Sequence, residues 1–354
     1  MLRTEFLDKL TIVAPAVAGN NVIPIMSNFW FTGDFLMAYN DKIAISVPCK
    51  TDFEGAIPRQ IFDLMKNSRA KEVEFTPNEK GDELLVKAAA SRVSLTMLPP
   101  EDFIFKMPAS KKNSDLLQVN SKKFLAGIRA CLRSTLADSV TPEQMGITLT
   151  TKGKLLVMWA TNSVTMTRVE IKLTAEPDFD RVILPVQFCQ QLLSFASKEE
   201  TVEIEIADDH ALVLIDKIKL FGLILQTEKP LKFQEVFDRH LPSEVLENEV
   251  EIPQKVELML ERSSVVADMN AEQMFVTIGV KKGVMKFHTK SGNIEVDDSV
   301  QLPDHPDVEK LCVEPRLLKE GLGEFDRMLI TDGCAALSNE STIYLVAASA
   351  SAKK

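Results

Sequence analysis

The feature that most constrains the fold of this chain is an internal repeat with a period near 130 residues. The segment Glu143–Met145 matches Glu272–Met274, and each is followed by a similar strand-like run at an offset of 129 residues. Three prolines keep nearly the same spacing: Pro58, Pro185 and Pro315 each open an apolar, helix-like run. The pattern predicts three copies of one fold in tandem.

Chain length agrees with this repeat. A chain of 354 residues exceeds what one hydrophobic core usually supports, whereas three domains of about 118 residues each have an ordinary size. Polar stretches at residues 108–115 and 243–251 resemble short linkers between them. We therefore expect three domains, at residues 1–115, 116–246 and 247–354.

Apolar periodicity predicts that each copy runs helix, strands, helix, strands, which is an α+β architecture. In the first copy we expect strands within residues 28–40, 42–49, 73–78, 82–90 and 92–98. Asn120 or Ser121 is the expected N-cap of the helix that opens the second copy. The six expected helices span residues 2–18, 58–71, 120–135, 184–198, 252–266 and 313–327.

The sequence offers little support for an enzyme. It lacks the phosphate-binding, dinucleotide-binding, zinc-protease and serine-hydrolase motifs, and Gly321 and Gly323 interrupt or end a helix instead of following a strand. The acid pairs at residues 208–209 and 297–298 lie in polar contexts that favour solvated loop acids. We expect no catalytic residue and no cofactor.

Cysteine and histidine spacing predicts neither a disulfide framework nor a metal site. The five cysteines are far apart, which favours reduced core thiols, and the four histidines have no partner at metal-ligand spacing. No apolar stretch approaches the roughly 20 residues of a membrane span, and acids interrupt the N-terminal apolar run. We expect a cytoplasmic protein without a membrane partner.

The distribution of charge is uneven. The formal net charge is −10, which by itself argues against binding to nucleic acid. Yet the six expected helices carry 0, +3, +4, +1, 0 and −1, a total of +7 that leaves −17 for the remaining residues. Basic charge is therefore concentrated on the expected helices of an otherwise acidic chain.

The charges on two of these helices also share a face. In residues 120–135 the apolar positions 124, 128 and 132 follow one stripe, and Lys122, Arg129 and Arg133 follow another. In residues 58–71 we expect Ile61, Leu64 and Met65 to point inward and the basic residues outward. An ordinary solvated helix face is the alternative interpretation for any single helix.

The ordered segments resemble a known family. The most specific stretch runs from Ala56 to Phe103 and ends in R-x-S-L-x-x-L-P-x-x-D-F; further support comes from VIPIMSNFWF, LPVQFCQQLLSF, VFDRHLP and the terminal STIYLVAAS. Over essentially its whole length the chain resembles the bacterial DNA sliding clamp, the β subunit of DNA polymerase III. Its departures favour a divergent, phage-encoded member.

The resemblance implies a polymerase processivity factor without enzymatic activity. Two crescent-shaped subunits would join head to tail into a homodimeric ring around double-stranded DNA, with helices lining the hole and sheets outside. A clamp loader and a DNA polymerase would be partners, in a bacterial or infected-host cytoplasm. The expected DNA-facing residues are Arg59, Lys66, Arg69, Lys122, Lys123, Arg129, Arg133 and Lys198.

The resemblance also implies an apolar pocket that captures a short peptide from partner proteins. Two departures affect this site: the family's T-D-G-H-R-L run reads TNSVTM here, and its M-P-M-R-L ending reads VAASASAKK. Packing at a domain interface is the alternative role for these residues. The matching positions are Thr161, Asn162, Ser163, Val164, Thr165, Met166, Arg239, His240, Cys334, Ala336, Leu345 and Ala347.

For the ring interface we expect the end of the first domain to meet the third domain of the other subunit. Apolar residues would meet apolar residues, and Arg92 would face acids. The alternative is that Phe103 and Phe105 belong to the core of the first domain. The expected interface residues are Arg92, Phe103, Ile104, Phe105, Val265, Val266, Glu295, Asp297 and Asp298.

Two other classes of function stay open at this point. A DNA-independent scaffold that presents peptide pockets on the same repeated fold would not be retained on circular duplex DNA. A hydrolase that uses scattered acids would lose its activity when Asp208 or Asp297 is replaced.

Overall fold

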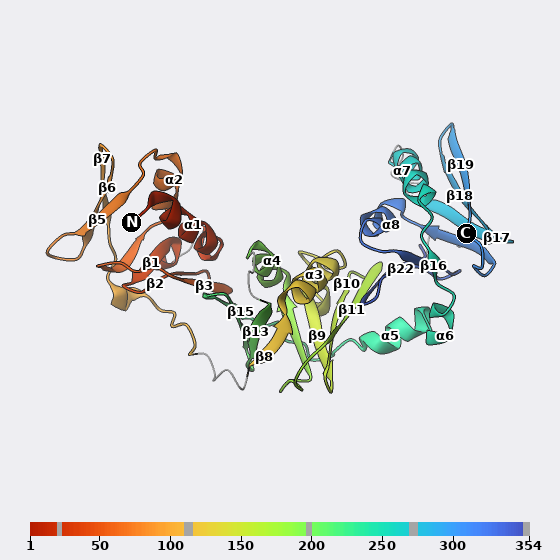
Figure 1. The fold of residues 1–354 in the computed structure, drawn as a ribbon, viewed down its shortest axis with the longest axis horizontal. Coiled ribbons are helices and arrows are strands. Elements are labelled where there is room, and N and C mark those ends of the chain that lie inside the picture. The colour runs from red at the N-terminus through yellow and green to blue at the C-terminus, as the bar shows by residue number, and fades with distance from the viewer. Residues whose placement is uncertain (20–22, 110–115, 196–199, 269–274, 350–354) are drawn as a thin grey trace. The chain divides into compact units, whose positions relative to one another are not determined.

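The computed structural model describes residues 1–19, 23–109, 116–195, 200–268 and 275–349 (Figure 1). It contains two compact units, each built from two stretches of chain. The first unit combines Met1–Leu125 with Gln187–Leu225, and the second combines Ala126–Val186 with Gln226–Lys354. The middle third of the sequence therefore contributes strands to both units.

The first unit contains an eight-stranded antiparallel sheet, in the order β4-β1-β2-β3-β15-β14-β13-β8, and a three-stranded sheet, β5-β6-β7. Helix α1 packs against α2 and against β2 and β3. The strands are β1 Asn28–Thr32, β2 Phe35–Tyr39, β3 Ile43–Pro48, β4 Glu54–Pro58, β5 Val73–Pro77, β6 Glu83–Ala88, β7 Ser91–Thr96, β8 Leu117–Asn120, β13 Thr201–Ile206, β14 His210–Ile215 and β15 Ile218–Leu223. The helices are α1 Arg3–Val13, α2 Gln60–Asn67, the start of α3 Ser121–Leu132, and nearly all of α4 Val186–Ser194.

The second unit contains an eight-stranded sheet, in the order β12-β9-β10-β11-β23-β22-β21-β16, and a four-stranded sheet, β19-β18-β17-β20. Helix α7 packs on α8, β18 and β19, and α8 packs on β22 and β23. The strands are β9 Gly146–Lys152, β10 Leu155–Thr161, β11 Thr165–Lys172, β12 Arg181–Pro185, β16 Val250–Glu251, β17 Val276–Lys281, β18 Val284–Ser291, β19 Ile294–Gln301, β20 Val308–Val313, β21 Arg327–Ile330, β22 Cys334–Ser338 and β23 Thr342–Ala347. The helices are α5 Phe233–His240, α6 Ser243–Leu246, α7 Lys255–Ala267 and α8 Pro315–Leu322.

One strand order occurs three times along the chain. Four consecutive strands pair as β4-β1-β2-β3, as β12-β9-β10-β11 and as β20-β17-β18-β19, with the fourth strand always beside the first. After a helix, three further strands pair as β7-β6-β5, β15-β14-β13 and β23-β22-β21. The last two sets end on β8 and β16, and an isolated bridge between Leu2 and Glu72 takes that place in the first. The three copies share one topology, as the repeat predicts.

The exact domain boundaries stay a prediction. Residues 110–115, at the expected first boundary, lie outside the described residues, as does the repeat marker Glu272–Met274. The expected second linker, residues 243–251, instead holds the short helix α6 and the edge strand β16. That stretch is therefore structured, because β16 pairs with β21 through Val250 and Met328.

All six expected helices are present, five within their predicted ranges and α7 ending one residue beyond its range, at Ala267, but the prolines play two roles. Pro315 is the first residue of α8, where its missing N–H costs nothing. Pro58 and Pro185 instead end β4 and β12, the strands at one end of their eight-stranded sheets, where a residue without an N–H is tolerated. The sequence patterns missed β4 and the helix α5, whose N-cap residue Lys232 makes no side-chain capping bond.

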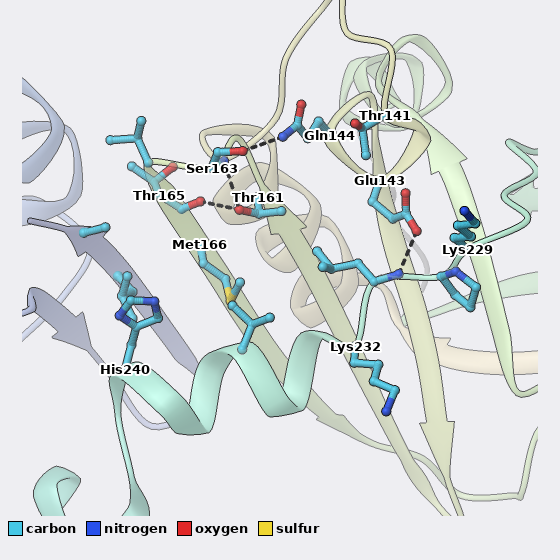
Figure 2. A pocket seen from close by; sticks show the side chains of 16 residues that line it. Thr141, Glu143, Gln144, Thr161, Ser163, Thr165, Met166, Lys229, Lys232 and His240 are labelled. Atoms are coloured by element: carbon cyan, nitrogen blue, oxygen red, sulfur yellow. Dashed lines mark hydrogen bonds between the residues drawn. The ribbon is translucent and has the colours of Figure 1, made fainter. Parts of the chain in front are cut away.

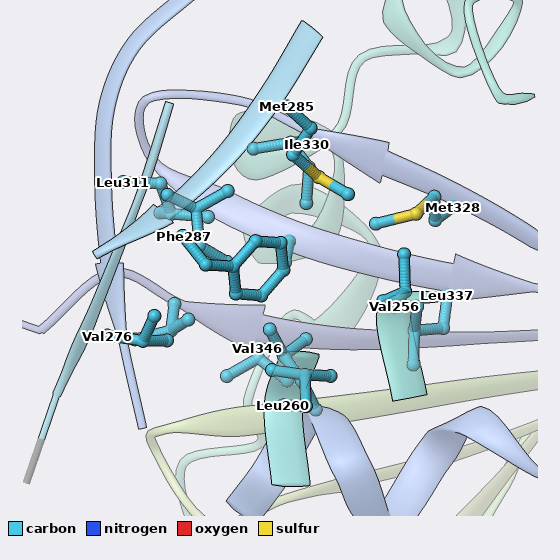
Figure 3. Packing of buried hydrophobic residues seen from close by; sticks show 14 of the residues in the cluster. Val256, Leu260, Val276, Met285, Phe287, Leu311, Met328, Ile330, Leu337 and Val346 are labelled. Atoms are coloured by element: carbon cyan, nitrogen blue, oxygen red, sulfur yellow. The ribbon is translucent and has the colours of Figure 1, made fainter. Parts of the chain in front are cut away.

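Apolar side chains fill the space between helices and sheets. In the second unit the ring of Phe287 is surrounded by residues of α7, β17 and β23, among them Leu260, Val276 and Val346 (Figure 3). Helix α8 approaches its sheet so closely that a Cβ added to Gly321 would lie 2.6 Å from a methyl carbon of Leu337. Close helix–sheet contact therefore requires glycine at this position.

Two further observations concern the cysteines and the length of the helices. All five cysteines are buried and unpaired with one another, as expected for core thiols. Among the described residues, none of the helices combines the length and apolarity that crossing a membrane requires.

Candidate functional site

A cavity of about 550 Å³ opens on the second unit (Figure 2). Its lining comes from four separate segments: the turn at residues 141–144, the β10–β11 hairpin, the segment from residue 229 into α5, and strand β23. Met166 points into the space above α5, and His240 lies at the C-terminal end of that helix (Figure 2). The pocket therefore exists only because the chain brings distant segments together.

The floor of the pocket is the surface of an apolar cluster. Met166 and Leu345 are buried in it, and Leu231, Val236 and Ala347 pack against it while lining the cavity. Beneath them, Trp159 stacks on Phe233 of α5 at a ring separation of 5.6 Å. Burial of these aromatic rings holds α5 on the sheet, since large aromatic side chains dominate such contacts.

An ion pair fixes one wall. The carboxylate of Glu143 accepts hydrogen bonds from the guanidinium of Arg181 and from the backbone N–H of Leu231, both at 3.0 Å. Arg181 also donates to the carbonyl of Leu231 at 2.9 Å. Both backbone polar groups of Leu231 are thus bonded to one largely buried pair, of which Figure 2 shows Glu143 and its bond to the N–H. Burial lowers the pKa of Arg181, and the charge of Glu143 acts in the opposite direction.

The opposite end is closed by a chain of side-chain hydrogen bonds. Gln144 donates through Nε2 to the hydroxyl of Ser163 at 2.5 Å and accepts a bond from Ser139 at 2.6 Å. Ser163 has a left-handed backbone with φ of 73°, a conformation that strains any residue with a Cβ. The hydroxyl of Ser163, a residue with a strained backbone, therefore links the β10–β11 turn to the wall that carries Gln144.

A second set of hydroxyl groups supports this turn from inside. Thr165 donates to Ser134 at 2.9 Å, and Ser134 lies 2.8 Å from the hydroxyl of Thr167. The carbonyl of Thr165 accepts a bond from Thr161 at 2.9 Å. These buried groups satisfy one another, so the turn is rigid where it meets the cavity.

Eight of the twelve expected pocket residues line the cavity. The eight are Thr161, Ser163, Val164, Thr165, Met166, His240, Leu345 and Ala347. The other four are not among its lining residues: Asn162 caps the turn by accepting the N–H groups of Val164 and Thr165, and Arg239 is exposed on α5. Cys334 and Ala336 are buried in the cluster below the floor, and burial raises the pKa of the Cys334 thiol.

The remaining lining residues were missed. Glu143 and Gln144 were noticed only as a repeat marker, and the segment before α5 carried no motif. Their proximity depends on tertiary bonds between residues far apart in sequence. The missed residues are Thr141, Glu143, Gln144, Lys229, Pro230, Leu231, Lys232 and Val236.

The three DNA-facing residues expected on α2 are exposed but do not all lie within the helix. Arg59, Lys66 and Arg69 are exposed, but Arg59 is the N-cap of α2 and Arg69 follows its end. Ile61 and Met65 are buried as expected, whereas Leu64 is exposed. Much of the positive charge of this predicted helix therefore lies on its flanks.

Helix α3 carries the clearest basic surface. Lys122, Lys123 and Arg129 are exposed, and Asn120 caps the helix by accepting the N–H of Lys123 at 3.0 Å. The helix contains three basic residues and no acidic one. Arg133, beyond the helix end, is largely buried and is bonded to Glu324. Lys198 lies outside the described residues.

Both aromatic interface candidates and one aliphatic candidate pack inside their own unit. Phe103 stacks on Trp30 at 3.9 Å, and Phe105 stacks on Tyr39 at 4.2 Å, which supports the alternative core role. Val266 is buried in α7. Ile104 and Val265 are exposed, at 60% and 63%.

The charged interface candidates lie on edge strands. Arg92 is exposed on β7, the edge of the three-stranded sheet. Strand β19 is the edge of the four-stranded sheet and carries the three acids. Within this chain Glu295 and Asp297 lie beside His288, and Asp298 pairs with Arg262 at 3.1 Å.

Comparison with solved structures shows which fold this is. No protein-family model matches the chain, and no curated protein matches its sequence. The chain is similar to the DNA polymerase III β subunit of Thermotoga maritima (17% identity, TM-score 0.82) and to the β subunit from the DNA polymerase of Streptococcus pyogenes (18%, 0.85). It is also similar to the sliding clamp of Pseudomonas aeruginosa bound to griselimycin (18%, 0.84).

Each match covers 99% of this chain and 98% of the other, so the likeness extends over nearly the full length of both chains. Identities this low establish shared architecture and also confirm divergence. From end to end, this chain has the three-copy fold of the bacterial sliding clamp, the β subunit of DNA polymerase III.

Proposed function

We propose that this protein is a sliding clamp: a ring of two copies that encircles double-stranded DNA, moves along it without reading sequence, and tethers a DNA polymerase. The observation that carries the proposal is the full-length agreement of fold with sliding clamps, in three copies of one topology. Tethering requires no chemical step, so the proposed role is not enzymatic. A clamp loader would place the ring on DNA.

The basic surface of α3 supports the DNA part of this proposal. Lys122, Lys123 and Arg129 end in mobile, solvated charges that can exchange among phosphates. We propose that they face the duplex together with Arg59, Lys66, Arg69 and Lys198. Arg133 contributes less, because its guanidinium is bonded to Glu324. An acidic remainder of the protein would repel DNA from other surfaces.

The pocket supports the tethering part. Its apolar floor suits one or two hydrophobic side chains of an extended peptide, and its polar rim can bond the peptide backbone. We propose that it holds a short segment of the polymerase and, in turn, of the loader. Asn162, Arg239, Cys334 and Ala336 serve this site indirectly, through the turn, the rim of α5 and the floor.

For ring closure we propose that the β7 edge of one copy meets the β19 edge of another. Edge strands present unpaired backbone N–H and C=O groups that a second chain can complete. Arg92 on β7 complements the acids at positions 295, 297 and 298. A groove of about 680 Å³ beside β7, lined by Leu64, Met65 and Val93 among others, can receive the exposed Val265. Because the two edges differ, contact is head to tail.

The solution mass of the full chain tests this arrangement. We expect sedimentation equilibrium to give twice the 39.5 kDa chain mass, because each copy carries one of each edge. Val265→Glu would place a charge in the apolar groove and shift the equilibrium toward monomer. Leu258→Glu is the matched control, since Leu258 is also an exposed apolar residue of α7, at 44%. A monomeric native chain, or equal dissociation of both variants, would contradict the proposed joint.

A further inference from the structure

The hairpin of β18 and β19, labelled in Figure 1, contains one imidazole and two carboxylates whose ligand atoms lie close together. His288 lies directly opposite Asp297 in the strand register, and Glu295 is two positions along β19 on the same side. Residues two apart on a strand share a face, so the pairing alone sets this arrangement. All three side chains are accessible to solvent.

The potential ligand atoms converge closely. His288 Nδ1 lies 2.9 Å from an oxygen of Asp297 and 3.8 Å from Oε1 of Glu295, and all three ligand atoms are within 4.8 Å of one another. Two atoms bound tetrahedrally at about 2.1 Å from a metal ion lie roughly 3.4 Å apart. The observed spacing needs only side-chain adjustment to meet that geometry.

The neighbouring charges leave these ligand atoms available. Lys290 lies 3.5 Å from Oε2 of Glu295, the oxygen that faces away from the imidazole. Asp298 points to the other side of β19 and pairs with Arg262. A metal ion would therefore replace the contact between His288 and Asp297 without breaking the other two pairs.

We infer that His288, Glu295 and Asp297 form a binding site for a transition-metal dication of the zinc class. One imidazole nitrogen and two carboxylate oxygens suit Zn²⁺, whereas Mg²⁺ and Ca²⁺ prefer oxygen ligands alone. Paired strands hold the ligands in place, and water would complete the coordination. All three ligands come from this hairpin, so the site does not depend on the proposed ring; in that ring, Zn²⁺ and the partner subunit's Arg92 would compete for Glu295 and Asp297. Sequence spacing missed it because the register, not a local motif, joins residues 288 and 297.

Calorimetric titration with ZnCl₂ tests the site. Tag-free full-length protein is treated with a chelator, dialysed and titrated near neutral pH, with MgCl₂ as the comparison. We expect one saturable Zn²⁺ site per chain and no Mg²⁺ binding at the same concentrations. The five cysteines do not compete in the folded chain, because all are buried. Bound Zn²⁺ should also raise the thermal unfolding midpoint.

Three variants assign the signal to this hairpin. H288A and D297N replace exposed side chains and should each weaken Zn²⁺ binding by roughly tenfold or more, since even indirect ligand support is worth that much. H210A is the matched control, because His210 lies 2.6 Å from the carboxylate of Asp209 but belongs to no group of three ligands among the described residues. Far-UV circular dichroism checks that each variant is folded.

Absence of saturable Zn²⁺ binding by the unsubstituted protein would overturn the inference and leave an ordinary exposed ion-pair cluster. Full binding by folded H288A would also overturn it. Loss of binding in H210A alone would place the metal at His210 and would likewise overturn the inference.

Discussion

The pocket of the second unit and the basic face of α3 differ in how far their polar groups are already committed to the protein. In the pocket, Glu143, Arg181 and Gln144 each bond to other residues and fix the walls. On α3, Lys122 and Lys123 extend into solvent. A fixed site can select a partner by shape, whereas free charges can hold a phosphate backbone anywhere along its length. The two proposed partners, a peptide and a sliding duplex, need these opposite properties.

This contrast predicts that single substitutions affect the pocket more than the helix. The largest effect is expected for Glu143→Ala, which leaves Arg181 without its carboxylate partner and the N–H of Leu231 without its acceptor, while the carbonyl of Leu231 keeps its bond from Arg181. We expect a loss of about 3 kcal/mol in the free energy of unfolding, at the lower end for breaking a buried pair, because a quarter of Arg181 reaches solvent. Urea unfolding measures this.

The matched control for that substitution is Glu235→Ala. Glu235 pairs with Lys232 beside the same pocket, but both side chains are exposed. Exposed pairs contribute at most about 1 kcal/mol. Equal losses for Glu143→Ala and Glu235→Ala would mean that the buried pair does not hold the wall.

The next largest effect concerns binding at the pocket. Val164 lines the cavity and is 49% exposed, so Val164→Glu should leave the fold intact and place a charge where an apolar side chain binds. We expect affinity for peptides selected on the full chain from a random library to fall by roughly tenfold or more, as for a central contact residue. Fluorescence polarisation with the labelled peptides measures the change.

Val140→Glu controls for the added charge. Val140 belongs to the neighbouring loop, is 99% exposed and does not line the cavity. If both variants lower the affinity for the same peptides equally, the selected peptides bind elsewhere. The proposal that the pocket selects a partner by its fixed shape would then be contradicted.

A smaller effect is expected where the pocket stores backbone strain. Ser163 holds a φ of 73° at a position where the clamp family commonly has glycine. Both Ser163→Ala and Ser163→Gly lose the bond to Gln144. The alanine variant keeps the backbone strain, and the glycine variant relieves it. We expect the glycine variant to be more stable than the alanine variant by about 1 kcal/mol. Equal stabilities in urea would show that the turn is unstrained.

The smallest effects are expected on α3. Removing Lys122, Lys123 or Arg129 singly should weaken duplex binding mildly and should lower the slope of log affinity against log salt by about 0.9 per lost phosphate contact. Fluorescence anisotropy at several salt concentrations gives the slope. Lys217→Ala, on the exposed β14–β15 turn, is the control. A large loss from one α3 variant would indicate a specific contact instead of a diffuse one.

The sequence predicted the basic face of α3 better than the wall of the pocket. The charges of α3 could be read from local periodicity, because a helix face is set by spacing within twelve residues. The wall of the pocket could not, because Glu143, Arg181 and Leu231 meet only after the sheet has formed. Half of the lining came from family resemblance, at positions on one hairpin, at the end of α5 and on the last strand.

The fold shows a similar limit. Repetition predicted three copies, and periodicity predicted the main helices, since both signals are carried along the chain. The sequence pattern did not distinguish a proline that begins a helix, Pro315, from one that ends an edge strand, Pro58. Both positions tolerate a residue without an N–H. The positive charge expected on α2 was overestimated because the helix was predicted to begin at Pro58 and to end after Arg69. In the structure Arg59 and Arg69 flank α2 instead of lying within it.

Retention on circular against linear DNA tests the central claim most directly. The full chain is incubated with nicked circular plasmid at a concentration that lets subunits exchange and rings reassemble around it, then separated from free protein at a salt concentration that suppresses phosphate contacts. Half of the sample is cut once with a restriction enzyme. A topological ring stays on the circles and is lost through the new ends. Equal retention before and after cutting, or none on either form, would contradict a protein that encircles DNA.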